Sequence, residues 1–327
     1  MDKNKKNMNK FDELFGSMDH HRFKKVKKSL EEFDKEDNFQ NSEDVERKAR
    51  NIGKDLAGDI GYPLKSKRIA LGFDILEYSK YPEEKQNLIP FVLSLLLDKT
   101  YDSVSRDEEF LFYMFSKKRF RKGFLHTGDG GFLILPNPLY GIVFALHFEM
   151  NLRSFNSGRI YPHLSRFIGK FDLRYVMGYG DVFHFEKNFF GPAIIIASRI
   201  MSRDKLNRFL IDQESYDYFL SEFNGVETLS MMSQEMILRT KSFQKFDKSK
   251  FNREGFVMGD ATKETPGIEN IFIQNIGKIE IKEEKFNVYN FFCQFSFDHY
   301  EENSKEPHKN YNRIRVSLGN LNPQGLV

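Results

Sequence analysis

Two acidic residues stand where apolar runs end, and their surroundings suit the binding of a metal ion. Asp129 lies in a Gly-Asp-Gly turn within residues 124–135, and the apolar runs on both sides predict a β-hairpin. Glycines adopt backbone angles that other residues resist, and they let large anions approach closely. Asp74 ends a second apolar run, residues 68–75, which predicts a buried strand. Carboxylates placed in this way can hold a divalent metal ion against phosphates, although Gly-Asp-Gly also forms ordinary hairpin turns.

The composition excludes several classes of protein. The 327 residues suffice for one large domain or two smaller ones, and the 40% of hydrophobic residues can form a sizeable core. A net charge of +3 gives no support for a nucleic-acid partner. The single cysteine, Cys293, excludes an internal disulfide framework and a multi-cysteine zinc site, and its apolar neighbours predict a buried, inert thiol.

Targeting and membrane signals are not expected in this chain. The charged residues 1–6 are not followed by the apolar stretch of a secretory signal. The longest apolar runs, such as Ala193–Ala197, fall far below the ~20 residues needed to span a bilayer. We therefore expect a cytoplasmic protein that makes no contact with a membrane.

The chain divides into three parts by composition. Residues 1–65 are highly charged, with apolar positions spaced as in one or two amphipathic helices. Residues 66–297 contain most of the predicted elements, and residues 298–327 form a polar tail. Within the middle part, residues 224–266 are polar and Lys-rich, which predicts an insertion or a long loop.

The predicted elements of the middle part mix helices with hairpins. Glycines and an aspartate at 178–181 predict a turn between two strands in residues 171–185. Pro90 is expected to kink or restart a helix that begins near Pro82 and continues through Leu97. This mixed order favours an α+β fold with a mostly antiparallel sheet. Further helices are predicted at 139–151, 191–201 and 214–223, and further strands at 208–211, 279–282, 286–295 and 313–318.

Several segments occur in an order that is more specific than any one of them. They are the strand ending in Asp74, the Gly-Asp-Gly hairpin, the strand Leu173–Gly180, the helix Gly191–Arg199 and a closing hairpin with Lys282. In this order and spacing they resemble the class III nucleotidyl cyclases, from about Lys67 to Phe297. The resemblance implies a ferredoxin-like palm, with a mostly antiparallel sheet flanked by helices.

The resemblance implies a reaction and a set of residues that perform it. Enzymes of this family convert a nucleoside triphosphate into its 3′,5′-cyclic monophosphate and pyrophosphate. The implied cofactors are two Mg²⁺ or Mn²⁺ ions per site, held by Asp74, Asp129 and the main chain of Ile75. Arg199 would stabilise the charge of the transition state, and Lys282 would bind the triphosphate.

The resemblance also implies how the nucleotide and a second subunit are placed. Backbone amides after Asp74 would surround the β- and γ-phosphates, with Ser79 as a hydroxyl donor and Phe73 as a further substrate-binding residue. In this family the two acids come from one subunit and the arginine from its partner. A homodimer with active sites at its interface is therefore implied.

Two positions that read the base depart from the purine-specific pattern. Leu125 stands where adenylyl cyclases have lysine, and Asn188 stands where they have aspartate or threonine. An amide offers both a donor and an acceptor, which matches the edge of uracil and, turned round, that of cytosine. The chain therefore resembles the bacterial pyrimidine cyclases of the Pycsar anti-phage system, which make cyclic UMP or cyclic CMP. That resemblance implies a UTP or CTP substrate and a downstream effector that binds the cyclic nucleotide.

Two further departures leave other functions open. Ile195 replaces the asparagine that orients the ribose, and Glu77 replaces a glycine of the phosphate-binding turn. A degenerate cyclase fold that only binds nucleotide would tolerate both changes. A purine cyclase whose base-reading residues lie elsewhere is the third possibility.

Overall fold

The computed structural model describes residues 66–113, 115–185, 188–224, 256–258, 267–281, 284–300 and 311–326, together with Lys28. The chain splits into two compact units. Of the first, the described residues beyond Lys28 are Ser66–Arg68 and Gly180–Pro192, and the second begins at Ile69. The helices predicted in residues 1–65 and most of the predicted 224–266 insertion lie outside the described residues.

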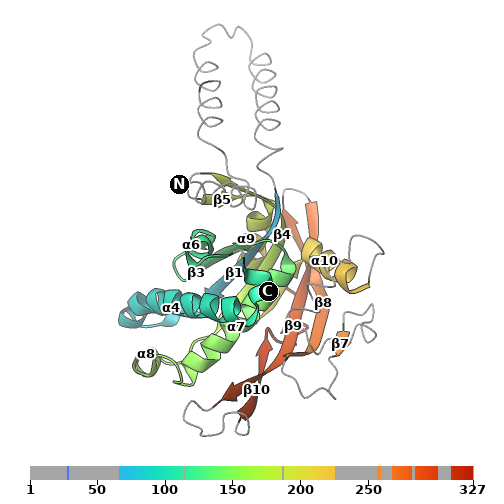
Figure 1. Ribbon diagram of the computed structural model, residues 1–327. Helices are drawn as coiled ribbons and strands as arrows, with labels where there is room; N and C mark the ends of the chain where they lie inside the picture. Colours follow the sequence, from blue (N-terminus) through green and yellow to red (C-terminus); the bar gives the residue numbers. More distant parts are fainter. Residues whose placement is uncertain are drawn as a thin grey trace, which may run out of the picture. The chain divides into compact units, whose positions relative to one another are not determined.

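A largely antiparallel sheet forms the centre of the second unit (Figure 1). Its strands follow the order β2-β3-β1-β4-β6-β9-β8-β7, and β10 pairs with β9. The pairing of β4 with β6 is parallel, whereas β3 pairs with β1, and β9 with β6, β8 and β10, in antiparallel fashion. The predicted α+β class is confirmed. The strands are β1 Ser66–Ile75, β2 Phe124–His126, β3 Gly130–Leu135, β4 Leu173–Phe185, β5 Asn188–Phe190, β6 Phe209–Asp212, β7 Phe256–Met258, β8 Gly267–Ile281, β9 Glu284–Tyr300 and β10 Tyr311–Leu318.

Helices flank both faces of this sheet. A Cβ at Gly141 of α7 would lie 2.9 Å from the sulfur of Met177, and a Cβ at Gly178 would lie 2.5 Å from the carbonyl oxygen of Ala193 in α9. Consecutive residues of a strand point to opposite faces, so α7 and α9 cover opposite faces of β4. The helices are the 3₁₀ turn η1 Tyr78–Lys80, α4 Glu83–Asp107, α5 Glu109–Phe112, α6 Lys117–Lys122, α7 Pro138–Asn156, α8 Pro162–Ile168, α9 Pro192–Arg203 and α10 Gln213–Asn224.

A predicted turn and a predicted helix restart are both absent. The turn predicted at 178–181 does not form, because β4 continues to Phe185 and its partner β5 follows at Asn188. The glycine at 178 serves close packing of a helix on the strand rather than a turn. Of the kink or restart predicted at Pro90, the restart does not occur, since α4 runs through Pro90 from Glu83 to Asp107. Packing of α4 along α7 favours one continuous helix despite the missing N–H of proline.

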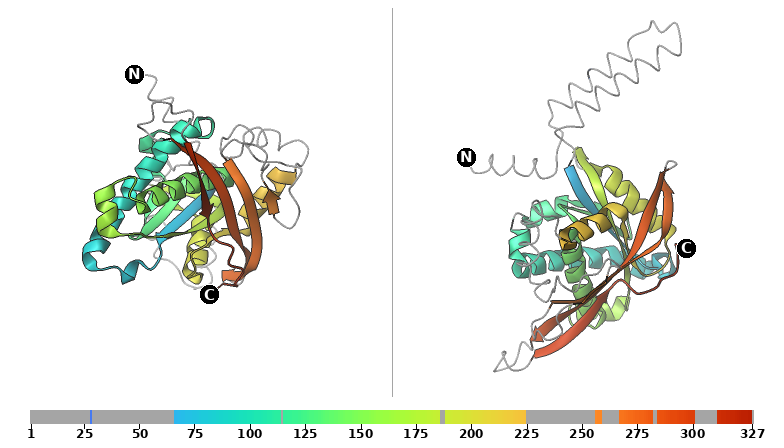
Figure 2. Two further views of the ribbon diagram at one scale, coloured as in Figure 1. Left: turned by 90° about the horizontal axis from the view of Figure 1, so that it is seen from below. Right: turned by 90° about the vertical axis from the view of Figure 1, so that its right-hand side faces the viewer.

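The strands of the last hairpin are longer than predicted. β8 and β9 span residues 267–281 and 284–300, and Figure 2 shows them as a long, curved ribbon. Cys293 lies fully buried in β9, and this burial raises the pKa of its thiol far above the ordinary value, as expected for an inert residue. Within the described residues, no helix has the length and apolar character that crossing a membrane requires.

Candidate functional site

The sheet brings the two predicted metal-binding acids together. Asp74, near the end of β1, pairs in register with Gly130, the residue after Asp129. The N–H of Ile75 donates to the carbonyl oxygen of Asp129 at 3.1 Å, which fixes the two segments side by side. Burial raises the pKa of the Asp74 carboxyl, a bonded arginine opposes this rise, and the charge of Asp129 adds to it.

The glycines of the turn are required by close backbone contacts. A Cβ at Gly130 would lie 2.0 Å from the carbonyl oxygen of Phe73, and a Cβ at Gly131 would lie 2.3 Å from that of Leu125. Gly128 has a φ of +106°, which other residues rarely adopt. Thr127 N–H donates to the Gly130 carbonyl at 3.1 Å and closes the turn. The sequence motif thus reflects a steric requirement that holds Asp129 next to β1.

Arg174 binds the Asp74 carboxylate, a contact that was not predicted from the sequence. Its Nε lies 2.5 Å from Oδ1 of Asp74, and its Nη2 lies 2.6 Å from Oδ2. Both side chains are mostly buried, with 24% of Arg174 and 11% of Asp74 exposed. Bidentate contacts of this kind are the strong form of the arginine–carboxylate pair. A signal for it existed, because Arg174 is the one charged residue in the apolar run 173–177.

The donor set fits a hard divalent cation. Magnesium and manganese prefer oxygen ligands, and two adjacent carboxylates supply them. A carboxylate has about four lone-pair positions, of which Arg174 uses two at Asp74, so that the others remain for a cation. Among the described residues no group of three or more acidic, histidine or cysteine side chains gathers around one point. A cation at Asp74 and Asp129 would therefore need further oxygens from the main chain, water or a bound phosphate.

The turn after β1 contains Glu77, which has a left-handed backbone. Glu77 has φ 57° and ψ 32°, in the left-handed region that glycine adopts at lower cost. Its carboxylate lies 2.5 Å from the ammonium of Lys80, and both groups are exposed. The left-handed backbone of this turn is therefore formed by a residue other than glycine. Ser79 is exposed within η1, as a hydroxyl donor to a ligand must be.

Three other predicted site residues differ in how exposed their side chains are. Phe73 is fully buried, with its ring stacked on Phe124 and edge-on to Phe148, so only its main chain can face a nucleotide. Arg199 is exposed on α9, and no ion pair or side-chain hydrogen bond joins it to another described residue. Leu125 is half-buried in β2.

The remaining positions singled out from the sequence are Asn188, Ile195 and Lys282. Asn188 is exposed at the start of β5, in the hairpin that belongs to the first unit. Ile195 is 45% exposed on α9. Lys282 lies outside the described residues.

Comparisons with known proteins give a weak structural likeness only. No family model matches the chain, and no curated protein matches its sequence. An adenylate/guanylate cyclase/hydrolase from Silicibacter pomeroyi matches with a TM-score of 0.39 and 12% identity, covering 69% of this chain and 96% of that one. The adenylyl cyclase CyaB from P. aeruginosa matches with a TM-score of 0.33 and 14% identity, covering 69% and 94%. A bacterial light-regulated adenylyl cyclase matches with a TM-score of 0.35 and 12% identity, covering 76% and 62%.

Proposed function

We propose that this chain is a nucleotide cyclase that converts a nucleoside triphosphate into its 3′,5′-cyclic monophosphate and pyrophosphate. The observation that carries the proposal is the placement of Asp74 and Asp129 on adjacent, paired backbone segments. A turn whose Gly130 and Gly131 leave no space for a Cβ maintains this placement. Two acidic residues held on adjacent backbone segments are what binding of metal-complexed phosphates requires.

In the proposed reaction one bond forms and one breaks at the α-phosphorus. The ribose 3′-oxygen bonds to phosphorus, its proton passes to solvent, and the bond to the β-phosphate oxygen breaks to release pyrophosphate. Two Mg²⁺ or Mn²⁺ ions, when bound, would lower the pKa of the attacking hydroxyl and neutralise phosphate charge. Asp74, Asp129 and the main chain of Ile75 would hold these ions.

Two arginines and a lysine would supply the positive charge for the phosphates. Arg174 already lies beside Asp74, and its partly exposed guanidinium can donate to a phosphate oxygen without leaving its strand. Lys282 is proposed to contact the triphosphate. Arg199 is proposed to donate to the oxygens that gain charge in the transition state.

The position of Arg199 supports a homodimer. Its side chain is exposed on α9 and contacts neither acid within the described part of its own chain. A second copy could bring the same residue to the acids of the first, and a symmetric pair would then hold two sites. The exposed Ile195, one turn earlier on the same helix, gives that face an apolar residue to bury.

We propose UTP or CTP as the substrate, and cyclic UMP or cyclic CMP as a second messenger in anti-phage defence. Leu125 lacks the charge that reads adenine, and its half-buried position suits an apolar pocket wall. The exposed Asn188 amide is available to the donor and acceptor edge of a pyrimidine. A downstream effector would bind the product. A purine substrate remains the alternative.

One experiment tests the proposal directly. Purified protein with Mn²⁺ is incubated with each of ATP, GTP, CTP and UTP, and the products are separated by chromatography. We expect one cyclic monophosphate and an equal amount of pyrophosphate, with UTP or CTP preferred. A cyclic purine product would keep the reaction class and reject the base assignment. Formation of no cyclic product from any of the four would reject the cyclase.

A nucleotide-binding module without turnover is the second candidate, and Arg174 favours it. Because the Arg174 guanidinium already neutralises Asp74, the affinity of this site for metal ions is lower than that of two unpaired carboxylates. Under this reading a triphosphate would bind, as calorimetry can measure, while chromatography finds it unchanged. Turnover that requires Asp74 excludes this candidate.

A further inference from the structure

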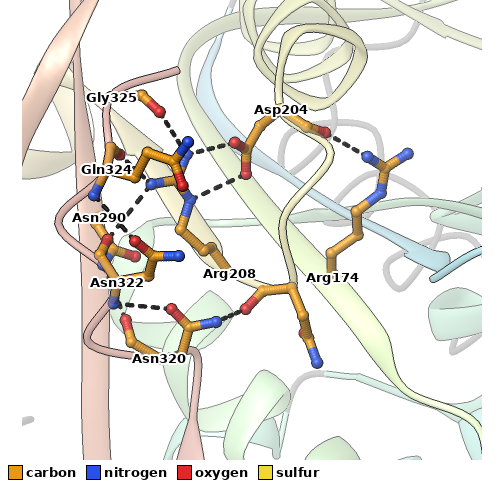
Figure 3. A network of polar contacts seen from close by, with 9 residues as sticks. Arg174, Asp204, Arg208, Asn290, Asn320, Asn322, Gln324 and Gly325 are labelled. Atoms are coloured by element: carbon orange, nitrogen blue, oxygen red, sulfur yellow. Dashed lines mark hydrogen bonds and ion pairs between the residues drawn. The ribbon is translucent and has the colours of Figure 1, made fainter. Parts of the chain in front are cut away.

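A fully buried arginine connects the region of the site to a surface segment far away in sequence. Arg208, just before β6, is 1% exposed, and its guanidinium pairs with the carboxylate of Asp204 through Nη2 and through Nε at 3.1 Å. Its other N–H groups donate to three main-chain carbonyl oxygens, those of Asn322 at 3.4 Å, Gln324 at 2.5 Å and Gly325 at 3.3 Å. Figure 3 shows the guanidinium between these carbonyls and Asp204.

We call residues 320–325 the strap, because they lie across Arg208 and are held by their own side chains. The Asn320 side chain accepts from the N–H of Asn322 at 2.9 Å, and the Asn322 side chain accepts from that of Gln324 at 3.0 Å. The buried Asn290 donates to the carbonyls of Asn320 and Asn322 at 2.8 and 3.2 Å. The strap therefore has a defined backbone path whose carbonyls face Arg208.

The same network continues to the candidate site. Asp204 binds Arg208 through its side chain, while its main-chain carbonyl accepts from Nη1 of Arg174. The two other nitrogens of the Arg174 side chain hold Asp74. Arg174, Asp204 and Arg208 also line one small cavity in the second unit. Each link from the strap to Asp74 is thus a direct hydrogen bond or ion pair.

We infer that the strap is a positioning element for Arg174 and, through it, for the carboxylate of Asp74. A guanidinium buried this deeply needs all its partners, and three of these are strap carbonyls. Without the ordered backbone of the strap, Arg208 and Asp204 could move. Arg174 would then lose its hydrogen bond to the main-chain carbonyl of Asp204. The effect on catalysis rests on the proposed function, whereas the link to Arg174 does not.

The test of the link uses NMR of the metal-free full chain. The variant Asn320→Ala/Asn322→Ala removes both turns of the strap but leaves every main-chain carbonyl in place. We expect the Nε–H of Arg174, assigned by its loss in Arg174→Lys, to exchange with water about tenfold faster than in wild type. The control Leu321→Ala changes an exposed side chain in the same segment and should leave this rate unchanged.

Unchanged exchange in a folded strap variant would overturn the inference, whatever the activity of the chain. Should the double variant unfold, Asn322→Ala alone provides the milder change, with the same expected direction. If wild type turns over a triphosphate, kcat of the strap variant should fall about tenfold, with KM for the nucleotide little changed. When the two strap substitutions are added to Arg174→Lys, kcat should be the same as in Arg174→Lys alone. Equal losses in both backgrounds would show that the strap does not act through Arg174. Faster exchange in a chain without turnover would reject the proposed function and keep the link.

Discussion

Arg174 holds the carboxylate of Asp74 with two hydrogen bonds, Nε to Oδ1 at 2.5 Å and Nη2 to Oδ2 at 2.6 Å. A residue predicted to bind a metal ion is thus already neutralised by a cation from the neighbouring strand. The pair favours the ionised form of a buried acid, because the arginine opposes the burial that raises the pKa of Asp74. It also makes Asp74 and Arg174 one unit whose members cannot be changed independently.

This coupling should appear in a double-mutant cycle on stability. Arg174→Met leaves the Asp74 charge without its partner, so we expect a loss of about 3 kcal/mol in the free energy of unfolding at pH 7. Asp74→Asn with Arg174→Met should recover part of that loss, giving a coupling energy of about 1–3 kcal/mol. Urea unfolding at pH 7 measures all four proteins. Additive effects would mean that the pair contributes nothing of its own in solution.

Replacement of either acid should abolish metal-dependent turnover. Asp74→Asn and Asp129→Asn keep the size of the side chain but remove the charge that would hold the ion, so we expect activity to fall by at least ~10³-fold. The matched control is Asp98→Asn, because Asp98 of α4 also pairs with an arginine, Arg121 of α6, and neither residue belongs to the candidate site. Full activity in either site variant, measured by product chromatography, would contradict the assignment of that residue.

Mixing two inactive variants tests whether Arg199 acts on a partner subunit. Arg199→Ala alone should lower kcat by ~10²–10³. In an equal mixture of Arg199→Ala and Asp74→Asn, half of the dimers would be mixed, and each mixed dimer would hold one intact site. We expect about a quarter of the wild-type activity to return after subunit exchange. If activity stays at the level of the single variants, Arg199 does not act across an interface.

The glycine turn predicts different costs at two neighbouring positions. Gly130→Ala would place a methyl group 2.0 Å from the carbonyl oxygen of Phe73, so β1 and β3 must separate, at about 3 kcal/mol of stability. A Cβ at Gly128 meets nothing within 4 Å, and only the φ of +106° opposes alanine there, at about 1 kcal/mol. Thermal unfolding compares the two variants. Equal losses would show that the close approach at Gly130 is not rigid.

Asp212 predicts a pH dependence of stability. Its buried carboxylate accepts from the N–H groups of Tyr179 at 3.0 Å and Ser215 at 2.9 Å, yet burial raises its pKa from 3.8 to about 6. The folded state therefore keeps this proton to higher pH than the unfolded state. Its contribution to stability is present below about pH 4 and is lost as the pH rises to about 6, by roughly 3 kcal/mol.

The variant Asp212→Asn imitates the protonated carboxyl at every pH. The free energy of unfolding of wild type, measured in urea, should fall relative to that of the variant between pH 4 and 6. The difference should stay constant from pH 7 to 8. A constant difference across the whole range would show that Asp212 titrates normally.

The acids could be predicted from the sequence because local chemistry marks them. An acid at the end of an apolar run and an acid between glycines each have a local pattern, and the register of β1 with β3 places them on adjacent segments. The α+β class followed in the same way from the order of periodic segments. Such patterns depend on neighbours in the chain, which a single sequence displays.

The pairing of Arg174 with Asp74 and the absence of a turn at 178–181 could not be predicted, because both depend on residues distant in sequence. Arg174 meets Asp74 across 100 residues, and its charge within an apolar run marks a partnered residue without indicating which acid is the partner. Gly178 has the local pattern of a turn, but α9 packs against it and needs the space of a side chain. Both features are determined by tertiary contacts, and a local sequence pattern carries no information about such contacts.

The burial of Cys293 makes the native chain suitable for site-specific labelling. It is the only cysteine, and a fully buried thiol with a strongly raised pKa reacts slowly with maleimides and methanethiosulfonates. A cysteine introduced at an exposed position, such as Ser198 on α9, would then carry a spin label or a dye without removal of any native residue. Distances between such labels on two copies of the chain would report directly how the copies face each other.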